Sequence, residues 1–306
     1  MQRAYMSKLM ELAEKDRNIL HLVADSDTGF DELFARYFPD QIYNFGIAEE
    51  HMVAAAAGMA TAGKIPFVYT NGAFLAYRSL EFIRDDVCFQ NLNVKLVGMG
   101  SGLSIGALGP THHTTEDIAV LRSIPNLMIL SPATPLQVQQ CVEQAYSHKG
   151  PVYIRIGMTG EKEYFTDNEQ LACSGQNQML NGKDVTVFTT GSILEEVMEA
   201  SDILNKSGID ITVVNVVTIK PFGEGEFLKR VNSTRLIVSV EEHNVHGGLG
   251  SIMAEIMARR GIGKRLLSIG LNDIFAEGFS GDQRIIRKQN YLDAQNIANC
   301  IVEALQ

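Results

Sequence analysis

Two adjacent carboxylates and a histidine, Glu49, Glu50 and His51, open an alanine-rich segment at residues 48–63. The run QIYNFGI before it is typical of a strand, and in a parallel sheet the residues at a strand's carboxyl end face the crevice where ligands bind. The helix dipole favours an acid in the first turn, which explains Glu50 without any chemistry. Glu49 directly follows apolar residues, so we interpret it as a candidate acid–base group.

Three further features have side chains that could act on a ligand. Phe74 and Tyr77 are spaced like one helical turn after the apolar run PFVYT, although such a pair usually belongs to a core. His112 lies in the loop sequence GPTHH, where a histidine is usually solvated but can serve acid–base chemistry. Arg155 lies within the apolar run PVYIRIG, and burying an arginine is costly unless it is paired. We therefore take these residues as candidate ligand contacts.

The elements that must position these side chains alternate along the first half of the chain. Short runs rich in valine and isoleucine predict strands that are buried on both faces, and segments with apolar residues three and four apart predict helices. This alternation indicates a parallel sheet wrapped by helices, the α/β class. The predicted strands are 19–25, 41–47, 66–70, 93–100, 127–132 and 151–157, and the predicted helices are 3–15, 48–63, 74–90 and 134–148.

The pattern changes at about residue 160, where a polar stretch with Asn-Gly and Ser-Gly turn signals begins. A second alternating set follows and predicts a smaller α/β domain of four strands. We divide the chain into a first domain at 1–165, a linker at 166–183 with room for an edge strand, and a second domain at 184–306. The strands of the second domain are expected at 185–191, 210–221, 235–242 and 265–273, with helices at 194–208 and 249–261 among them.

Composition restricts the class of partner and the compartment. The 306 residues carry a formal net charge of −10, with acids interspersed and no basic stripe, so we do not expect nucleic acid as a partner. The four cysteines form no C-x-x-C pair and no secretory leader is evident, which favours the cytoplasm. No apolar stretch approaches the length of about 18 residues that a membrane span requires, so we expect a soluble protein.

The motifs around Glu49 resemble a known family. GIAEEH is similar to the Gly-Ile-x-Glu segment of the transketolase family of thiamine diphosphate enzymes, in which the glutamate contacts N1′ of the cofactor's aminopyrimidine. The resemblance implies that Glu49 is this glutamate. A carboxyl group in a dry site can share a proton with the aminopyrimidine ring and so promote cofactor activation. The stretch 69–87 resembles the segment whose aromatic residues stack on that ring, which implies this role for Phe74 and Tyr77.

Other segments match the same family in the same order. Residues 109–135 resemble its Gly-Pro-Thr-His-Gln loop, which implies that His112 contacts the donor substrate or polarises its oxygen. The strand with Arg155 resembles the one whose arginine binds the anionic tail of the sugar. Arg3 and Asp27 match a phosphate-contacting arginine and an active-site aspartate. The resemblance therefore implies a pyrimidine-binding domain followed by a transketolase C-terminal domain.

One half of the cofactor site is not recognisable. The family's Gly-Asp-Gly motif, which holds magnesium and the diphosphate, has no counterpart, and SGDQ at 280–283 lacks the context. The resemblance thus implies a C-terminal subunit of a split transketolase, with thiamine diphosphate shared with an N-terminal partner subunit that holds the magnesium, in an α2β2 heterotetramer. His243 and His246 are spaced like zinc ligands, but their order and the missing third ligand favour a structural or interface role, so no metal site is expected here.

Two departures concern the substrate. Leu108 stands where the family has an acidic residue that binds a sugar hydroxyl, and Gly100 stands where it has a pocket histidine. Because a lost acceptor changes preference for a hydroxyl, we expect ketol transfer from a ketose phosphate or a similar anionic ketose, such as a sulfonate, to an aldose. A 1-deoxyxylulose-5-phosphate synthase relative, a 2-oxo-acid dehydrogenase β-subunit and a non-catalytic module of the same fold are alternatives. The sequence TTEDIA after GPTHH disfavours the dehydrogenase subunit, and Leu108 disfavours the synthase. The presence of all four site residues, Glu49, Phe74, His112 and Arg155, disfavours the non-catalytic module.

Overall fold

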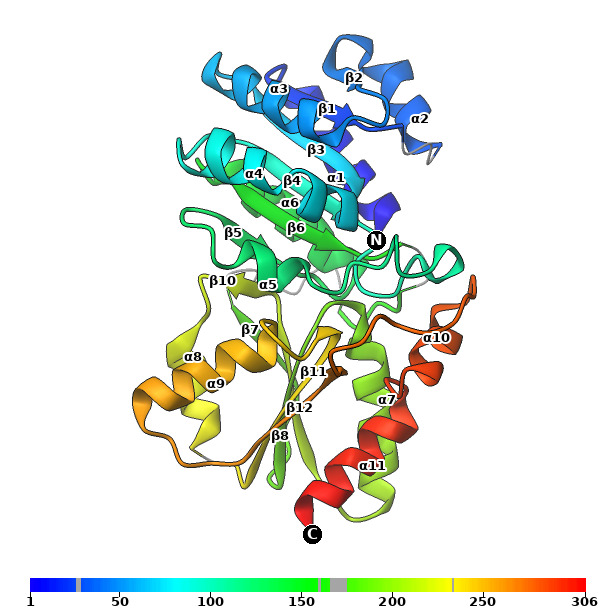
Figure 1. Ribbon diagram of the computed structural model, residues 1–306, viewed down its shortest axis with the longest axis vertical. Coiled ribbons are helices and arrows are strands. Elements are labelled where there is room, and N and C mark those ends of the chain that lie inside the picture. Colours follow the sequence, from blue (N-terminus) through cyan, green and yellow to red (C-terminus); the bar gives the residue numbers. More distant parts are fainter. Residues whose placement is uncertain (26–28, 159–160, 166–174, 233) are drawn as a thin grey trace.

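The chain forms two α/β halves, each built on its own sheet (Figure 1). The computed structural model describes residues 1–25, 29–158, 161–165, 175–232 and 234–306. In Figure 1 the first sheet and its helices lie above the second, and the C-terminus lies at the lower end of the molecule. This is the α/β class predicted from the alternating pattern.

The first sheet has the strand order β10-β5-β6-β4-β3-β1-β2. All neighbours are parallel except β10, which runs antiparallel to β5. Parallel strands that are covered on both faces read as continuous apolar runs, which is why the sequence indicated them. The strands are β1 (Ile19–Val23), β2 (Ile42–Asn44), β3 (Ile65–Asn71), β4 (Lys95–Met99), β5 (Met128–Leu130), β6 (Val152–Ile156) and β10 (Thr218–Lys220).

Helices cover both faces of this sheet. On one face, α1 (Gln2–Lys15), α2 (Phe30–Tyr37) and α6 (Pro135–Ser147) enclose one apolar cluster. On the other, α3 (Glu49–Thr61) and α5 (Asp117–Leu121) enclose a second cluster together with the segment predicted as one helix at 74–90. That segment consists of a π-helical turn η2 (Phe74–Arg78), a short α4 (Leu80–Phe82) and a second π-helical stretch η3 (Ile83–Cys88). Two 3₁₀ turns complete this half, η1 (Pro39–Gln41) and η4 (Gly106–Leu108).

The second sheet has the order β12-β11-β8-β9-β7, and only β7 is antiparallel to its neighbour. Figure 1 shows α8 and α9 on one side of it and α7 and α11 on the other. The elements are β7 (Gln176–Leu180), β8 (Val185–Thr190), η5 (Gly191–Ile193), α7 (Leu194–Lys206), β9 (Ile211–Val216), α8 (Glu224–Val231), β11 (Leu236–Asn244), α9 (Leu249–Arg260), β12 (Leu266–Leu271), α10 (Gln283–Gln289) and α11 (Ala294–Leu305).

Two expectations about the strands need correction, while the edge strand for which the predicted linker had room is present. Strand β2 lies at an edge and is not buried on both faces, and its Tyr43 is 45% exposed. The run 210–221 is two strands, because β9 stays in the second sheet while β10 crosses to pair with β5 of the first. The predicted linker contains the edge strand β7, and its residues 166–174 lie outside the described part of the chain.

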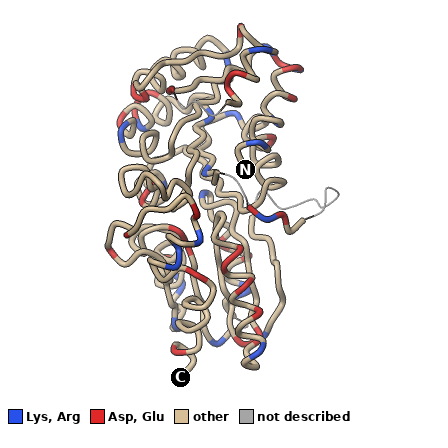
Figure 2. The backbone as a smooth tube through the Cα atoms, turned by 90° about the vertical axis from the view of Figure 1, so that its right-hand side faces the viewer, with Lys and Arg blue, Asp and Glu red and all other residues tan. Residues whose placement is uncertain are grey.

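One of the apolar clusters spans the two halves. A single apolar cluster runs from Leu22 and Met52 of the first half to Phe188 and Leu249 of the second. Together with the crossing strand β10, this cluster joins the halves by buried apolar contacts as well as by hydrogen bonds. Charged residues of both signs are interspersed along both halves (Figure 2). Among the described residues, no helix combines the length and the apolarity that crossing a membrane would need.

Candidate active site

Glu49 lies at the first turn of α3, just after β2. Gly46 has φ +65°, a conformation that glycine adopts without strain, and its N–H donates to the Asn44 side chain at 2.8 Å. This turn brings Glu49 back over the carboxyl end of the sheet, where the residue is 1% exposed. The N-terminal end of a helix favours a negative charge, so the backbone itself supports a carboxylate here.

Four side chains from three segments meet at this point, and we call them the Glu49 cluster: Glu49, Phe74, Arg78 and His112. Nη1 of Arg78 forms an ion pair with Oε2 of Glu49. The Arg78 guanidinium carbon also lies 4.7 Å from the centre of the Phe74 ring. Phe74 also meets His112 edge to face, with ring centres 5.0 Å apart. The structure thus brings together three of the predicted site residues and one that the sequence analysis missed.

Arg78 was missed because only the pair three positions apart was considered. In an α-helix, residues three apart and four apart share one face, so Phe74 can meet both Tyr77 and Arg78. Residues 74–78 form a π-helical turn, in which hydrogen bonds join residues five apart. In this turn the Arg78 guanidinium lies over the Phe74 ring. A basic residue four positions after an aromatic one was the available signal.

Tyr77 is directed at the loop that carries His112. Its hydroxyl donates to Oε2 of Glu116 at 2.8 Å and accepts from the Glu116 backbone N–H at 2.9 Å. Burial, followed by the nearby Asp117 and Glu116 carboxylates, raises the pKa of Tyr77, so the phenol stays protonated and keeps donating. This orientation makes Tyr77 an anchor of the loop, and its role as a stacking surface stays a prediction.

His112 is half-buried at the edge of the cluster. Its Nδ1 lies 2.9 Å from the Thr111 hydroxyl, and its backbone is held by a hydrogen bond from its N–H to the Gly109 carbonyl at 2.9 Å. Burial lowers the pKa of His112 below its ordinary value of 6.5, so the imidazole is neutral at pH 7. A neutral ring can both donate and accept a hydrogen bond, which suits a group that contacts a carbonyl or hydroxyl oxygen.

Arg155 is not placed to bind a substrate anion in this structure. The residue is 2% exposed, and its Nε pairs with the Asp117 carboxylate at 2.9 Å. Its Nη2 donates to the backbone carbonyls of Thr114 and Glu242, each at 2.9 Å. A buried arginine was expected to need a partner, which was predicted to be the substrate. The structure shows that the partner is Asp117 of the same chain. The predicted role in binding the sugar's anionic tail is therefore unsupported, and Arg155 connects β6, the His112 loop and β11.

The remaining predicted residues lie apart from the cluster or outside the described chain. Arg3 is exposed on α1, Leu108 is 55% exposed at the end of η4, and Asp27 falls among the residues that the structure does not describe. Gly100 has φ +75°, and a Cβ there would lie 2.3 Å from Cδ1 of Ile105. A histidine at position 100 would therefore need the Ile105 side chain to move and would strain the backbone at this positive φ.

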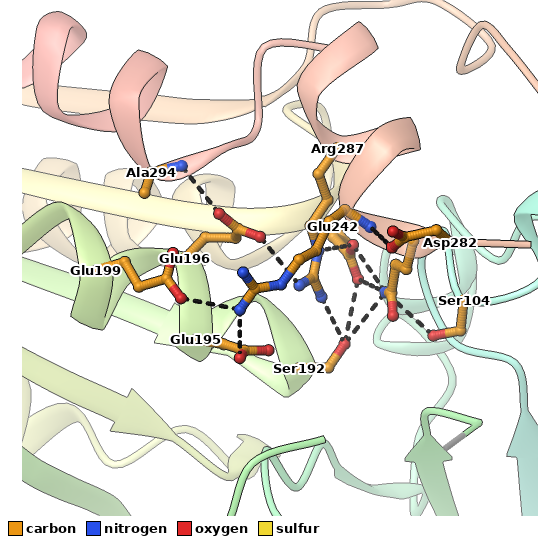
Figure 3. Close-up of polar contacts among 11 residues, drawn as sticks. Ser104, Ser192, Glu195, Glu196, Glu199, Glu242, Asp282, Arg287 and Ala294 are labelled. Carbon is orange, nitrogen blue, oxygen red and sulfur yellow. Dashed lines mark hydrogen bonds and ion pairs between the residues drawn. The ribbon is translucent and has the colours of Figure 1, made fainter. Parts of the chain in front are cut away.

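A second polar cluster joins the two halves through Glu242 (Figure 3). The Glu242 carboxylate accepts from Nε of Arg287 at 2.7 Å and from Nε2 of Gln283 at 3.0 Å. Gln283 also reaches Ser104 of the first half at 3.3 Å, and Arg287 donates to Ser192 at 3.1 Å. Because Arg287 and Glu242 are both buried, this is an internal ion pair that fixes α10 against β11.

The SGDQ segment belongs to this second cluster. Its Asp282 caps α10 by accepting from the Arg284 N–H at 2.9 Å, and its Gln283 bridges to Glu242. The segment also lines a cleft of about 330 Å³ between the halves. Among the described residues, no group of three or more His, Cys, Asp or Glu side chains is arranged to hold a metal ion.

The contacts of the His243 side chain connect elements of the fold. It is buried, its Nδ1 lies 2.6 Å from the Asn244 carbonyl, and its Nε2 accepts from the Ala119 N–H at 3.3 Å. These contacts require the tautomer with the proton on Nδ1. The ring therefore connects β11 to α5, across the two halves.

The Glu49 cluster fits one half of thiamine diphosphate. It offers a desolvated carboxylate, an aromatic ring and a neutral histidine at the carboxyl ends of parallel strands, which suits a flat heterocycle with ring nitrogens. Oε2 of Glu49 is engaged by Arg78, and among the described residues no partner is found for Oε1. A ring nitrogen can therefore bond to Oε1 without displacing an existing contact.

Comparisons with known proteins cover almost the whole chain. Residues 1–158 match the family described as transketolase, pyrimidine binding domain, and residues 176–297 match transketolase, C-terminal domain. A protein of Actinobacillus succinogenes named as one of the subunits of apulose-4-phosphate transketolase is 35% identical over 92% of this chain and 91% of its own. A 6-deoxy-6-sulfo-D-fructose transketolase subunit of a Clostridium species is 33% identical over 89% and 85%. A solved structure described as split gene transketolase, inactive beta4 tetramer, has a TM-score of 0.88 and 32% identity, covering 99% of this chain and 97% of that one.

Proposed function

The chain belongs to the transketolase family, and from that premise we propose that it is the C-terminal subunit of a split transketolase. It transfers a two-carbon ketol unit from a ketose phosphate, or a similar anionic ketose, to an aldose. The observation that carries this proposal is the Glu49 cluster, in which Glu49, Phe74 and His112 lie together at the carboxyl ends of parallel strands. Relatives of nearly the same length that are named transketolase subunits support it.

Thiamine diphosphate, when bound, supplies a nucleophilic carbon and an electron sink for carbon–carbon bond cleavage. In our proposal Glu49 exchanges a proton with the aminopyrimidine at its free Oε1. Its 1% exposure keeps water from competing for that proton. His112, neutral and held by Thr111, hydrogen-bonds an oxygen of the donor sugar. Phe74, which packs against His112, would help to exclude water from the cofactor's side.

The site needs a second chain. We propose an N-terminal transketolase subunit as partner, which supplies the contacts to magnesium and the diphosphate. The end of β2 next to the cluster is open, because Ile47, two positions before Glu49, is 77% exposed. In our proposal this isoleucine belongs to the surface that the partner covers. Closed symmetry then favours an α2β2 heterotetramer.

The donor sugar carries an anionic tail in this proposal. The named relatives act on a phosphate ester and on a sulfonate, so both tails belong to the substrate class to be tested. Leu108 offers no acceptor for a sugar hydroxyl, which disfavours donors that depend on one at this position. We include a role in carbohydrate metabolism and a location in the cytoplasm in this proposal.

Reconstitution tests the proposal. The chain is mixed with the N-terminal subunit, thiamine diphosphate and Mg²⁺, and ketol transfer is measured with phosphorylated and sulfonated ketose donors and an aldose acceptor. We expect activity from the mixture and none from either chain alone. The Glu49→Gln variant is expected to lose on the order of 10²- to 10⁴-fold in rate, while Glu50→Gln, the matched control on the next residue, stays close to wild type. A mixture that binds no thiamine diphosphate, or a Glu49→Gln variant with wild-type rate, would refute the proposal.

A further inference from the structure

A loop of the second half lies against the loop that carries His112. Residues 272–282 connect β12 to α10 (Figure 1), and the Ser280 N–H in this stretch donates to the Gly106 carbonyl at 3.2 Å. A Cβ at Gly106 would lie 2.7 Å from the Ser280 carbonyl oxygen. Gly106 does not have a positive φ, so its glycine is explained by this close approach of the second half.

The same loop places an aromatic ring on Gly109. A Cβ at Gly109 would lie 2.2 Å from Cε1 of Phe279, and the three heavy atoms nearest to it all belong to the Phe279 ring. The ring therefore occupies the side of Gly109 where another residue would carry its side chain. Phe279 is 73% exposed, so it buries little of its own surface and adds little hydrophobic stabilisation. A place in the core does not explain this contact.

Gly109 begins the turn that holds His112. Its carbonyl accepts from the His112 N–H at 2.9 Å and from the His113 N–H at 3.2 Å. Gly109 has φ +71°, and glycine has more accessible backbone conformations than any other residue. A rotation at Gly109 would redirect this carbonyl and displace His112. A contact that restricts Gly109 therefore acts on the position of the imidazole.

The 272–282 loop is itself fixed, so it can support the first half. The Asn290 side chain bonds both the N–H and the carbonyl of Glu277, each at 2.9 Å. Asp282 caps α10 by accepting from the Arg284 N–H at 2.9 Å. Phe279 lies in the chain between Glu277 and Asp282, so the backbone that carries the ring is held on both sides.

We propose that Phe279 is a positioning residue for His112, because its ring, in contact with Gly109, keeps the turn at 109–112 in the conformation that presents the imidazole to the donor sugar. This inference rests on the proposed function, because it names a residue that supports the same site. It gives the second half a side chain that acts on the reaction through His112 without touching the substrate. Rates fall steeply when a reacting group is misplaced by about 1 Å, so a small restriction of this turn is sufficient.

The first test is ketol transfer by the reconstituted two-chain complex. We expect Phe279→Ala to lower kcat by about 5-fold or more, while the dissociation constant of thiamine diphosphate with Mg²⁺ stays within about 2-fold of wild type. Phe279→Tyr keeps the ring and should retain kcat within about 2-fold. In a His112→Gln background, Phe279→Ala should cost less than about a further 2-fold, because both changes act through one group. Phe275→Ala is the matched control, since Phe275 is a 75% exposed aromatic residue of the same loop.

The second test does not depend on catalysis. In NMR spectra of the full chain with isotope-labelled histidine, the His112→Gln variant identifies the His112 signal. Phe279→Ala should shift this signal and raise the pKa of His112 toward its ordinary value of 6.5, because a loosened turn lets water reach the imidazole. Phe275→Ala should leave both the signal and the pKa unchanged.

Three results would overturn the inference. The first is a Phe279→Ala variant with wild-type kcat and an unchanged His112 signal, and the second is an equal loss of kcat in Phe275→Ala. The third is a loss that persists in full in the His112→Gln background, since Phe279 would then act by another route. If Phe279→Ala does not assemble with the partner, Phe279→Leu replaces it, because it removes the flat ring but keeps apolar bulk. A wild-type complex without ketol transfer would refute the proposed function, and the NMR comparison would still decide whether Phe279 positions His112.

Discussion

Arg155 offers the clearest way to test how the two halves hold the site together. The change is Arg155→Met, which keeps most of the side-chain length and removes the guanidinium. Three contacts disappear: the ion pair with Asp117 at 2.9 Å and the hydrogen bonds to the Thr114 and Glu242 carbonyls at 2.9 Å each. Asp117 is then a buried carboxylate without its cation, and it still accepts a hydrogen bond from the Tyr153 hydroxyl at 2.9 Å.

The size of the effect follows from burial. Removing one partner of a buried ion pair costs about 3–5 kcal/mol, whereas an exposed pair is worth about 0.2–1 kcal/mol. For a chain of this size about 1 kcal/mol lowers the thermal midpoint by about 2 °C. We therefore expect Arg155→Met to lower the midpoint of the isolated chain by about 6–10 °C. Lys229→Met, which breaks the exposed pair with Glu226, should lower it by about 2 °C or less.

The assays are thermal unfolding of the isolated chain and donor KM of the reconstituted complex below the variant's midpoint. A structural role predicts a large loss of stability with a donor KM close to wild type. The double variant Arg155→Met with Asp117→Leu should recover part of the midpoint, because replacing both partners leaves no unpaired charge. A single variant that melts like wild type but shows donor KM raised by more than about 10-fold, the signature of lost uniform binding, would refute this reasoning and return Arg155 to the substrate site.

Three further predictions concern other groups. Tyr77→Phe removes the hydrogen bond to Glu116, so we expect a lower kcat with cofactor affinity near wild type; weaker thiamine diphosphate binding in calorimetry would speak against an anchor role. Burial lowers the pKa of Lys95 to about 7 from 10.5, so its folded state binds fewer protons than the unfolded chain between these values. Stability of wild type should therefore rise relative to Lys95→Met as pH increases from about 7 to about 10, and a constant difference in thermal midpoint would contradict this. Burial lowers the pKa of His112 below 6.5, so the wild-type rate of ketol transfer should hold steady as pH falls from about 8 to 6.5. The His112→Gln variant should have a lower rate. Its rate should also lack the fall below pH 6.5 that protonation of His112 causes in the wild type.

The sequence predicted the sheet strands well because most of them are buried on both faces. β1, β3, β4 and β6 are short, mostly apolar runs that contain valine, isoleucine or leucine, as expected in a parallel sheet covered by helices. β2 belongs to the apolar run at 41–47 but lies at the edge, so the number of covered faces could not be predicted from that run. The run at 210–221 looked like one strand because both of its halves are apolar. Its division between two sheets depends on contacts with β5, which is distant in sequence.

The candidate site was predicted in part for a similar reason. Glu49 could be placed because it follows a strand and begins a helix, which are local features. Arg78 could have been placed beside Phe74 from its spacing of four, but its ion pair with Glu49 depends on how this segment packs against α3, which is distant in sequence. Arg155 was recognised as unusual, but whether its partner is a substrate or Asp117 depends on how α5 packs against β6.

The second half of the chain contributes no side chain to the Glu49 cluster, yet it fixes the loop that carries His112. The Asn244 N–H donates to the Thr115 carbonyl at 2.7 Å, and the Glu242 carbonyl accepts from Arg155 at 2.9 Å. On the other side, Tyr77 holds Glu116 of the same loop at 2.8 Å. A loop bonded from both sides can adopt few conformations, so His112 is held in position before a sugar arrives. Substitutions in β11 that shift this backbone should therefore alter donor selectivity without touching the cofactor.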